Sequence, residues 1–377
     1  TGEAGDGIRS NPSGNSDWQD ATGTINIGND LTITVSGNSA DGLNINGSTV
    51  LNIGDNATIN TLYNGELKYS NGDTSDGAHA VRANFHATIN IGDGLTAGTL
   101  GESSHAVYAA QGRSTTNPTG GSKINIGKGA VLSTAGDGSH TVMMASNNGK
   151  IVIEEGAEMT TLGDGSHGVA AYADTSAKGS VANGAVEIGA GSTIATAGDG
   201  SHGVLAQRGI IEAGDGLNIS VEGSGSHGAY VNAATGSIEF LGGATIDNND
   251  NDGYAIYADK GTITGTAGNS TFNITGNMYA DNSGSIDLDT DNNSVFTGST
   301  ALANSGTINL NLKNNSYWHV TSSSEVSSLH VSGGSMVNLS HEAGMNTVVT
   351  VDDLSGSGGV FKFNTENWTV KPMAINW

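Results

Sequence analysis

Short segments in which apolar and polar residues alternate recur along the whole chain. One such segment ends in glycine and reads INIG at 25–28, 89–92 and 124–127, LNIG at 51–54 and VEIG at 186–189. A second recurs a few residues later, at 57–62, 130–135, 157–162 and 192–197. Alternation with period two, rich in β-branched residues and bounded by Gly, Asp and Asn, predicts short strands joined by tight turns. The glycine every few residues opposes helix.

A third string, GDGSHxV, recurs at the same interval. It occupies 136–142, 163–169 and 198–204, with weaker copies at 75–81, 102–107, 223–229 and 251–256. Each repeat therefore holds three short strands, and about eleven repeats fill the chain. One such unit cannot bury its own apolar face, whereas stacked units bury a continuous column. The sequence predicts an all-β, single-stranded parallel β-helix with three faces, a rod of roughly 50–60 Å at about 4.8 Å per rung.

Alternation also predicts which side chains point inward. The isoleucines of INIG face the core and Asn26, Asn90 and Asn125 face outward. The valine that ends each GDGSHxV string points inward, and the histidine two residues earlier is expected on the same face. Six imidazoles then form a ladder along one corner: His79, His105, His140, His167, His202 and His227. Three interpretations stay open for it: a structural corner in which each ring bonds a backbone group or its neighbour, a pH-sensitive stack, or a metal site.

The third residue after each histidine, and after Tyr254 in the seventh copy, forms a predicted outward stripe. Its members are Arg82, Tyr108, Met143, Ala170, Leu205, Tyr230 and Tyr257. Such a stripe can stack on sugar rings, dock a partner or pair two rods, unless a loop covers it. The turn aspartates Asp137, Asp164 and Asp199 should line up beside it, either to satisfy their turns or to bind calcium or a basic partner. Arg82, Arg113 and Arg208 are candidate cationic points.

Charge and composition narrow the partners. The 13 Lys and Arg residues stand against 37 Asp and Glu, a net charge of −24, which argues against nucleic acid and against an anionic membrane surface. The absence of cysteine excludes disulfides, thiolate metal sites and cysteine nucleophiles. No apolar run approaches the roughly 18 residues of a membrane helix.

No enzyme signature stands out. The Ser-His pair recurs in register, which is the behaviour of a structural repeat, and no GxSxG motif occurs. A unique, unrepeated cluster of Asp, His, Arg and Lys is not visible either. Residues 248–259 only loosely resemble a calcium loop, with Asp250, Asp252, Gly253 and Asp259 in place. We therefore expect neither catalysis nor a cofactor, and a polysaccharide-cleaving β-helix is kept as an alternative.

The register changes near residue 311, and there the chain resembles a known family. Over 314–366 the order is Trp318-x-Val320, Ser324-x-Val326, Leu329-x-Val331 with Gly333-Gly334, Val337-x-Leu339, then 347–351 and 354–361. This order is similar to the terminal stretch of the passenger domain of bacterial type V autotransporters of the AIDA and pertactin kind. The resemblance implies a right-handed β-helix, with the repeat region at 1–310 and a capping, autochaperone-like end of the same helix at 311–377.

The same resemblance implies a place and a role. Such passengers lie on the surface of Gram-negative bacteria or are secreted, and they touch the membrane only through a translocator barrel, which this chain lacks. The absence of cysteine fits export through an oxidising compartment. The adhesins of the family bind a host matrix protein or a glycan, or associate with their own kind in aggregation and biofilm. A virulence-associated adhesin acting through the side of its rod is the expected function, with self-association as the alternative.

Overall fold

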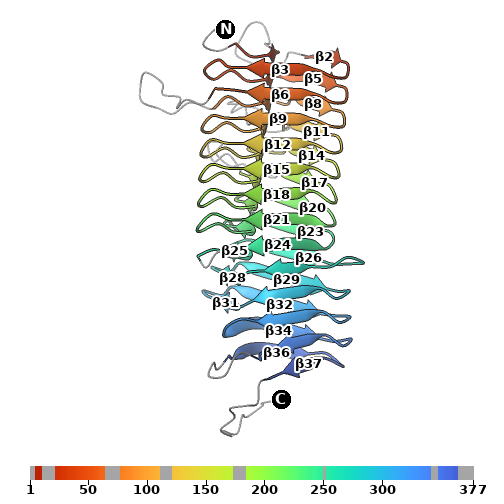
Figure 1. Cartoon of the computed structure of the whole chain (residues 1–377), viewed down its shortest axis with the longest axis vertical. Coiled ribbons are helices and arrows are strands. Elements are labelled where there is room, and N and C mark those ends of the chain that lie inside the picture. The colour runs from red at the N-terminus through yellow and green to blue at the C-terminus, as the bar shows by residue number, and fades with distance from the viewer. Residues whose placement is uncertain are drawn as a thin grey trace.

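The strands form a straight rod of stacked rungs (Figure 1). The computed structural model describes residues 5–10, 22–63, 77–110, 121–172, 184–248, 252–340 and 347–363. Within those ranges there is no helix, and the strands form three parallel sheets of eleven, thirteen and thirteen strands. The fold is a right-handed, three-faced parallel β-helix, as predicted.

Each sheet takes every third strand of the chain until the last few rungs. Sheet A contains β1 (Ile8–Arg9), β4 (Leu43–Ile45), β7 (Val81–Ala83), β10 (Val107–Ala109), β13 (Val142–Met144), β16 (Val169–Ala171), β19 (Val204–Ala206), β22 (Ala229–Val231), β25 (Ile256–Asp259), β28 (Met278–Asp281) and β31 (Thr300–Leu302). Sheet B contains β2 (Thr22–Ile27), β5 (Ser48–Ile53), β8 (Thr88–Ile91), β11 (Lys123–Ile126), β14 (Lys150–Ile153), β17 (Ala185–Ile188), β20 (Ile210–Ala213), β23 (Ser237–Phe240), β26 (Thr262–Thr266), β29 (Ser285–Thr290), β32 (Thr307–Leu312), β34 (Ser324–Val331) and β36 (Val349–Ser355). Sheet C contains β3 (Thr32–Val35), β6 (Thr58–Thr61), β9 (Thr96–Thr99), β12 (Val131–Thr134), β15 (Glu158–Thr161), β18 (Thr193–Thr196), β21 (Leu217–Val221), β24 (Ala244–Asn248), β27 (Asn273–Thr275), β30 (Val295–Gly298), β33 (Tyr317–Val320), β35 (Met336–Asn338) and β37 (Val360–Lys362).

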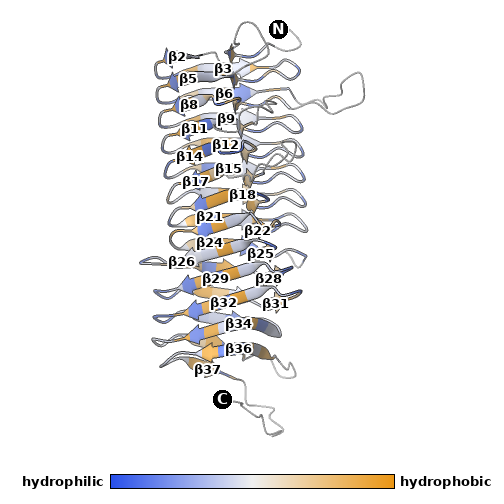
Figure 2. Cartoon of the chain, turned by 180° about the vertical axis from the view of Figure 1, so that it is seen from behind, coloured by the Kyte–Doolittle hydropathy of each residue, from blue (hydrophilic) through white to orange (hydrophobic). Residues whose placement is uncertain are grey.

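The register places equivalent residues of successive repeats directly beside one another. Val107 pairs with Val142, Val142 with Val169 and Val169 with Val204, and all four are fully buried. Orange and blue positions alternate along the strands in Figure 2, which reflects one inward and one outward residue in turn. Thirteen rungs at about 4.8 Å give a rod of roughly 58 Å, within the predicted range.

The outward asparagines form a ladder, as the alternation predicts. The side-chain amides of Asn52, Asn90 and Asn125 each donate a hydrogen bond to the Oδ1 of the asparagine one rung before, at 2.7 Å, and the row begins at Asn26. Because each amide uses its neighbour as a partner, the row reinforces the register along sheet B.

The last rungs are built differently from the repeats. In the described part of the chain sheet A ends at β31, whereas sheets B and C continue to β36 and β37. Trp318 of β33 is fully buried there; its ring stacks on Phe296 at 5.5 Å and its indole N–H donates to the Gly298 carbonyl at 3.0 Å. In this row of sheet C, Phe296 and Trp318 follow the isoleucines Ile246 and Ile274 of the rungs before.

None of the described residues belongs to a helix long and apolar enough to span a membrane.

Candidate functional site

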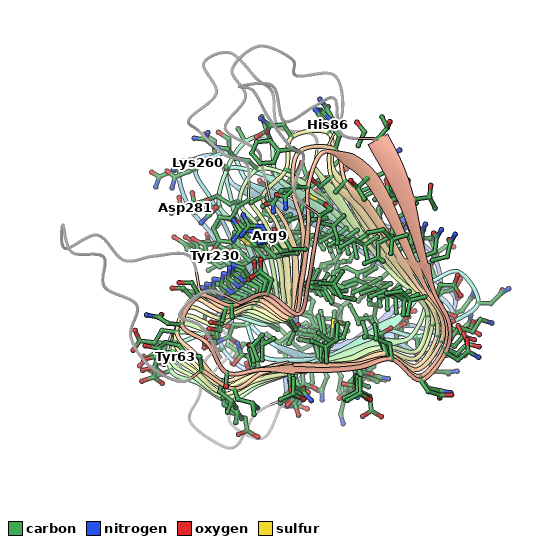
Figure 3. The ribbon with its side chains drawn as sticks, turned by 90° about the horizontal axis from the view of Figure 1, so that it is seen from above. Arg9, Tyr63, His86, Tyr230, Lys260 and Asp281 are labelled. Carbon is green, nitrogen blue, oxygen red and sulfur yellow. The ribbon has the colours of Figure 1, made fainter. Side chains whose placement is uncertain are left out.

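The GDGSH strings form an arm that projects from the rod between sheet C and sheet A, for example residues 135–141. Figure 3 looks along the rod and shows this arm as a lobe beside sheet A, with Tyr63 near its end. The arm has no strands of its own, so its backbone N–H groups need other partners. Backbone carbonyls of the next rung accept some of them, as the Asp164 carbonyl accepts the Gly138 N–H at 2.8 Å, and side chains of the motif accept others, one row per residue type.

Aspartate and serine provide two of these rows. Asp137 Oδ1 accepts the backbone N–H of Asp164 at 2.8 Å, and Asp164 Oδ1 accepts that of Asp199 at 2.9 Å. In the opposite direction, the Oγ of Ser166 accepts the N–H of Ser139 at 2.9 Å. The aspartates therefore line up and satisfy their turns, as one of the two interpretations predicts.

Histidine provides the third row. The Nδ1 of each imidazole accepts the backbone N–H of the equivalent residue in the next rung at 2.9–3.0 Å, from His79 through to the N–H of Tyr254. An Nδ1 that accepts this bond cannot carry a proton, so the ladder requires the neutral tautomer with the proton on Nε2. The rings stack with centroids 4.7–5.0 Å apart and planes within 13° of parallel.

Burial favours this neutral form. All six histidines are at most 9 % exposed. Burial first, and then the positive charge of neighbouring imidazolium or of Arg82, lowers the pKa of five of them well below its usual value: His79, His105, His140, His167 and His202. Each ring thus bonds a backbone group, as the structural-corner interpretation predicts, and the pH-sensitive interpretation stays a prediction.

The imidazoles lie against the predicted outward stripe, which corrects the expectation that they share the inward face of the valines. His79 contacts the Tyr108 ring at 4.6 Å, and His227 contacts Tyr230 at 4.9 Å and Tyr257 at 5.2 Å. The reason is a bend at the residue between histidine and valine, which interrupts the alternation of a continuous strand.

The stripe is therefore half-buried or buried in the described structure. Arg82, Tyr108, Met143, Tyr230 and Tyr257 are half-buried, whereas Ala170 and Leu205 are buried. Tyr230 lies in the angle between sheet A and the arm in Figure 3.

Three stripe residues are held in place by a charge or by other rings. Arg82 lies 3.7 Å from the buried Asp41 and 5.4 Å from the centre of the Tyr108 ring. Tyr230 and Tyr257 stack on each other at 4.8 Å, so each covers a ring face that a sugar would need. Burial, and then the Tyr230 and Asp259 charges, raises the pKa of Tyr257.

The outer side of the arm is the exposed part of this region. Asp137, Asp164 and Asp199 are exposed, and the residue that follows sheet C is an exposed leucine in three rungs: Leu62 at 47 %, Leu100 at 45 % and Leu162 at 60 %. We call these six residues the arm edge. An apolar row beside a carboxylate row is suited to contact with a partner that is both apolar and basic.

Sequence reasoning missed a second polar surface, on sheet B. There Asp287, Asp289, Lys313 and His330 come from three successive rungs. Asp287 continues the outward row of Glu187, Glu212 and Glu239, whereas the row of Asp289 and His330 lies beyond the ends of the four-residue strands before it. The signal was present in the sequence, because the alternation in SIDLDT (285–290) and TINLNL (307–312) runs for six residues instead of four.

The remaining candidates from the sequence, two arginines and the loose calcium loop, belong to neither of these surfaces. Arg208 is exposed just after β19, and Arg113 lies outside the described residues, as does Asp250 of the loose calcium loop. Among the described residues no group of three or more His, Asp or Glu side chains is arranged to hold a metal ion.

Comparison with known proteins adds no family. No protein-family model matches the chain, and no curated protein matches it.

Proposed function

We propose that this chain is the passenger of a type V autotransporter: a bacterial surface adhesin that binds a host matrix protein or glycan through the side of its β-helix. The β-helical rod and the order of residues over 314–366 support the family. The exposed arm edge carries the functional proposal, since it is a surface that the fold leaves available after its own hydrogen bonds are made.

The arm edge favours a partner with basic and apolar groups. Asp137 and Asp164 each use Oδ1 for the turn of the next rung, and their carboxylate charge remains at the surface. Carboxylates repeated at the rung spacing present a multivalent array, in which weak contacts add along the rod. The net charge of −24 steers basic partners toward the molecule as a whole.

A charge-neutral replacement tests this proposal without disturbing the turns. In the triple variant Asp137→Asn, Asp164→Asn and Asp199→Asn, the amide oxygen still accepts the backbone N–H while three charges disappear. Binding to immobilised matrix proteins and glycans is then measured for the wild-type and variant chains. We expect about tenfold weaker binding of the recognised partner, from about 0.5 kcal/mol per exposed charge.

A matched control carries the same change in charge at another corner. Asp55 and Asp93 accept backbone N–H groups of the next rung in the same way, at the turn between sheets B and C, and Asp30 lies beside them. The variant Asp30→Asn, Asp55→Asn and Asp93→Asn should bind like the wild type. Equal weakening by both triple variants would mean that only the overall charge matters and that the arm edge is no site.

Self-association is the second candidate, and the asparagine ladder favours it. The row Asn26, Asn52, Asn90 and Asn125 presents amides in register on the outer face of sheet B, and a second rod can pair with such a row. Sedimentation of the purified chain across concentration decides this: a strictly monomeric chain at high concentration excludes it.

A further inference from the structure

Two parallel rows of polar side chains cover the outer face of sheet B near its carboxy-terminal end. The rows follow the register of β26, β29, β32 and β34. We call these eight residues the sheet B platform: Thr264, Asp287, Asn309 and Ser328 in one row, and Thr266, Asp289, Asn311 and His330 in the other. Neighbours within a row are about 4.8 Å apart, so each row extends roughly 14 Å along the rod.

The platform exists because sheet B widens. Strands β11, β14, β17, β20 and β23 have four residues each, whereas β26, β29, β32 and β34 have five, six, six and eight. A four-residue strand presents one fully flanked outward position, and the longer strands present two. The widened face is hollowed into a shallow, open depression of about 400 Å³, lined by these eight residues with Gly265, Leu288 and Leu310 at its floor.

The lining mixes hydrogen-bond donors and acceptors and offers no free cation. Lys313, at the margin, lies 2.6 Å from Asp289 Oδ1 and 2.9 Å from Oδ2, so its charge is neutralised in place. Asn309 donates to Asp287, and His330 Nδ1 lies 3.0 Å from Ser355 Oγ. The side-chain oxygen of Asn311 accepts no hydrogen bond within the part of the chain that the structure describes. Hydroxyl, amide, carboxylate and imidazole groups thus stand side by side on one surface.

We propose that the sheet B platform binds an uncharged saccharide chain lying along the rod. Sugar hydroxyls both donate and accept, which matches the mixed lining, and two rows over four rungs suit several consecutive sugar units. The site lies on a different surface from the arm edge, and the inference does not depend on the adhesin proposal.

The chemistry disfavours the other ligand classes. Acidic, sulfated or phosphorylated sugars would meet Asp287 and Asp289 without a free cation to pair with, and like charges repel. A protein partner would find no apolar or aromatic anchor at the centre, where stable protein interfaces concentrate their binding energy. Anionic saccharides and proteins therefore serve as negative controls.

Saturation-transfer NMR on the full chain tests the proposal. The probes are hexasaccharides of β-1,4-glucan, β-1,3-glucan, α-1,4-glucan and mannan, together with hexagalacturonate as the anionic counterpart. Variants Asn309→Ala and His330→Ala each remove one polar group of the platform, and Asn125→Ala removes the equivalent ladder amide of sheet B outside the depression. Thermal unfolding of each variant confirms that it is folded. If Asn309→Ala does not fold, His330→Ala alone tests the platform.

We expect saturation transfer to at least one neutral hexasaccharide. Each platform variant should lower the affinity for that hexasaccharide about tenfold, as the loss of one good hydrogen bond implies. Asn125→Ala and the triple arm-edge variant should leave that affinity unchanged. The proposal is overturned if no neutral hexasaccharide binds at millimolar concentration, if hexagalacturonate binds as well, or if Asn125→Ala weakens binding as much as His330→Ala.

Discussion

Acid should unfold this protein through its histidine ladder. Five buried imidazoles have a pKa well below 6.5 in the folded chain, chiefly because of burial. In the unfolded chain they titrate near 6.5. The folded form therefore keeps its full stability above that value, and loses it as the pH falls below 6.5 toward the folded pKa values, because only the unfolded chain takes up the protons.

The loss of stability is large because the contributions of the five histidines add. One pH unit below 6.5, each imidazole that stays neutral in the folded chain and is protonated in the unfolded chain costs about 1.4 kcal/mol. Five such groups cost about 7 kcal/mol at pH 5.5, within the range of the whole stability of a typical domain, about 5–15 kcal/mol. Protonation also removes the Nδ1 acceptor and places cations at the ring spacing of 4.7–5.0 Å.

Urea unfolding followed by circular dichroism at pH 7.5, 6.5 and 5.5 measures this loss. The matched variant is His202→Asn, whose amide oxygen can accept the N–H of His227 as Asp41 Oδ1 accepts that of His79 at 2.8 Å. The variant starts less stable, because it loses ring contacts, but its pH dependence should be smaller by about 1.4 kcal/mol between pH 7.5 and 5.5.

Two results would refute the reasoning. The free energy of unfolding could change by less than about 1.4 kcal/mol over this interval, which would mean that the ladder accepts protons while folded. Alternatively, His202→Asn could show the same pH dependence as the wild type, and the acid sensitivity would then arise outside the ladder.

Three further changes test the rest of the fold by thermal or urea unfolding. Asp164→Ala should lower the free energy of unfolding by about 1 kcal/mol, because the N–H of Asp199 loses its acceptor, whereas Asp164→Asn should leave it unchanged. Equal effects of the two variants would exclude the hydrogen bond as the cause. Glu212→Gln should raise the free energy of unfolding by about 0.5 kcal/mol at pH 7, because burial and then the neighbouring glutamates raise the pKa of Glu212, so that its charge is unfavourable in the folded chain. This stabilisation should vanish below pH 4.5, and a destabilisation at pH 7 would contradict the reasoning. Trp318→Ala should cost about 3–5 kcal/mol, and a loss below 1 kcal/mol would show that the last rungs repack around the space.

The strands, their faces and their stacking were predictable because each depends on local alternation. INIG has one inward and one outward residue in turn, and the same pattern in every repeat can be buried only by stacking. The handedness came from the family resemblance, since the two hands share one alternation pattern.

The side-chain environments at the arm were less accessible from the sequence. The face of the histidines was misassigned because a bend separates each of them from the strand that follows. Alternation also does not reveal that Leu205 is buried, with only 3 % of its surface exposed, although it points away from the core. Such burial depends on neighbours that are distant along the chain.

Repetition by itself is no evidence of function. A side chain that bonds a neighbouring rung, as those of Asp164, Ser166 and His167 do, must recur in every rung for the row to continue. The recurrence of the most conspicuous motif is therefore explained by backbone hydrogen bonding. Beyond the surface charge of the arm-edge aspartates, recognition of a partner requires groups that the stacking does not determine, and these occur where the repeat is broken. Two such places are Leu162, which alanine replaces in the rungs before and after it, and the second row of the sheet B platform, which the shorter strands before it do not have. Substitutions there should change binding while leaving the rod intact.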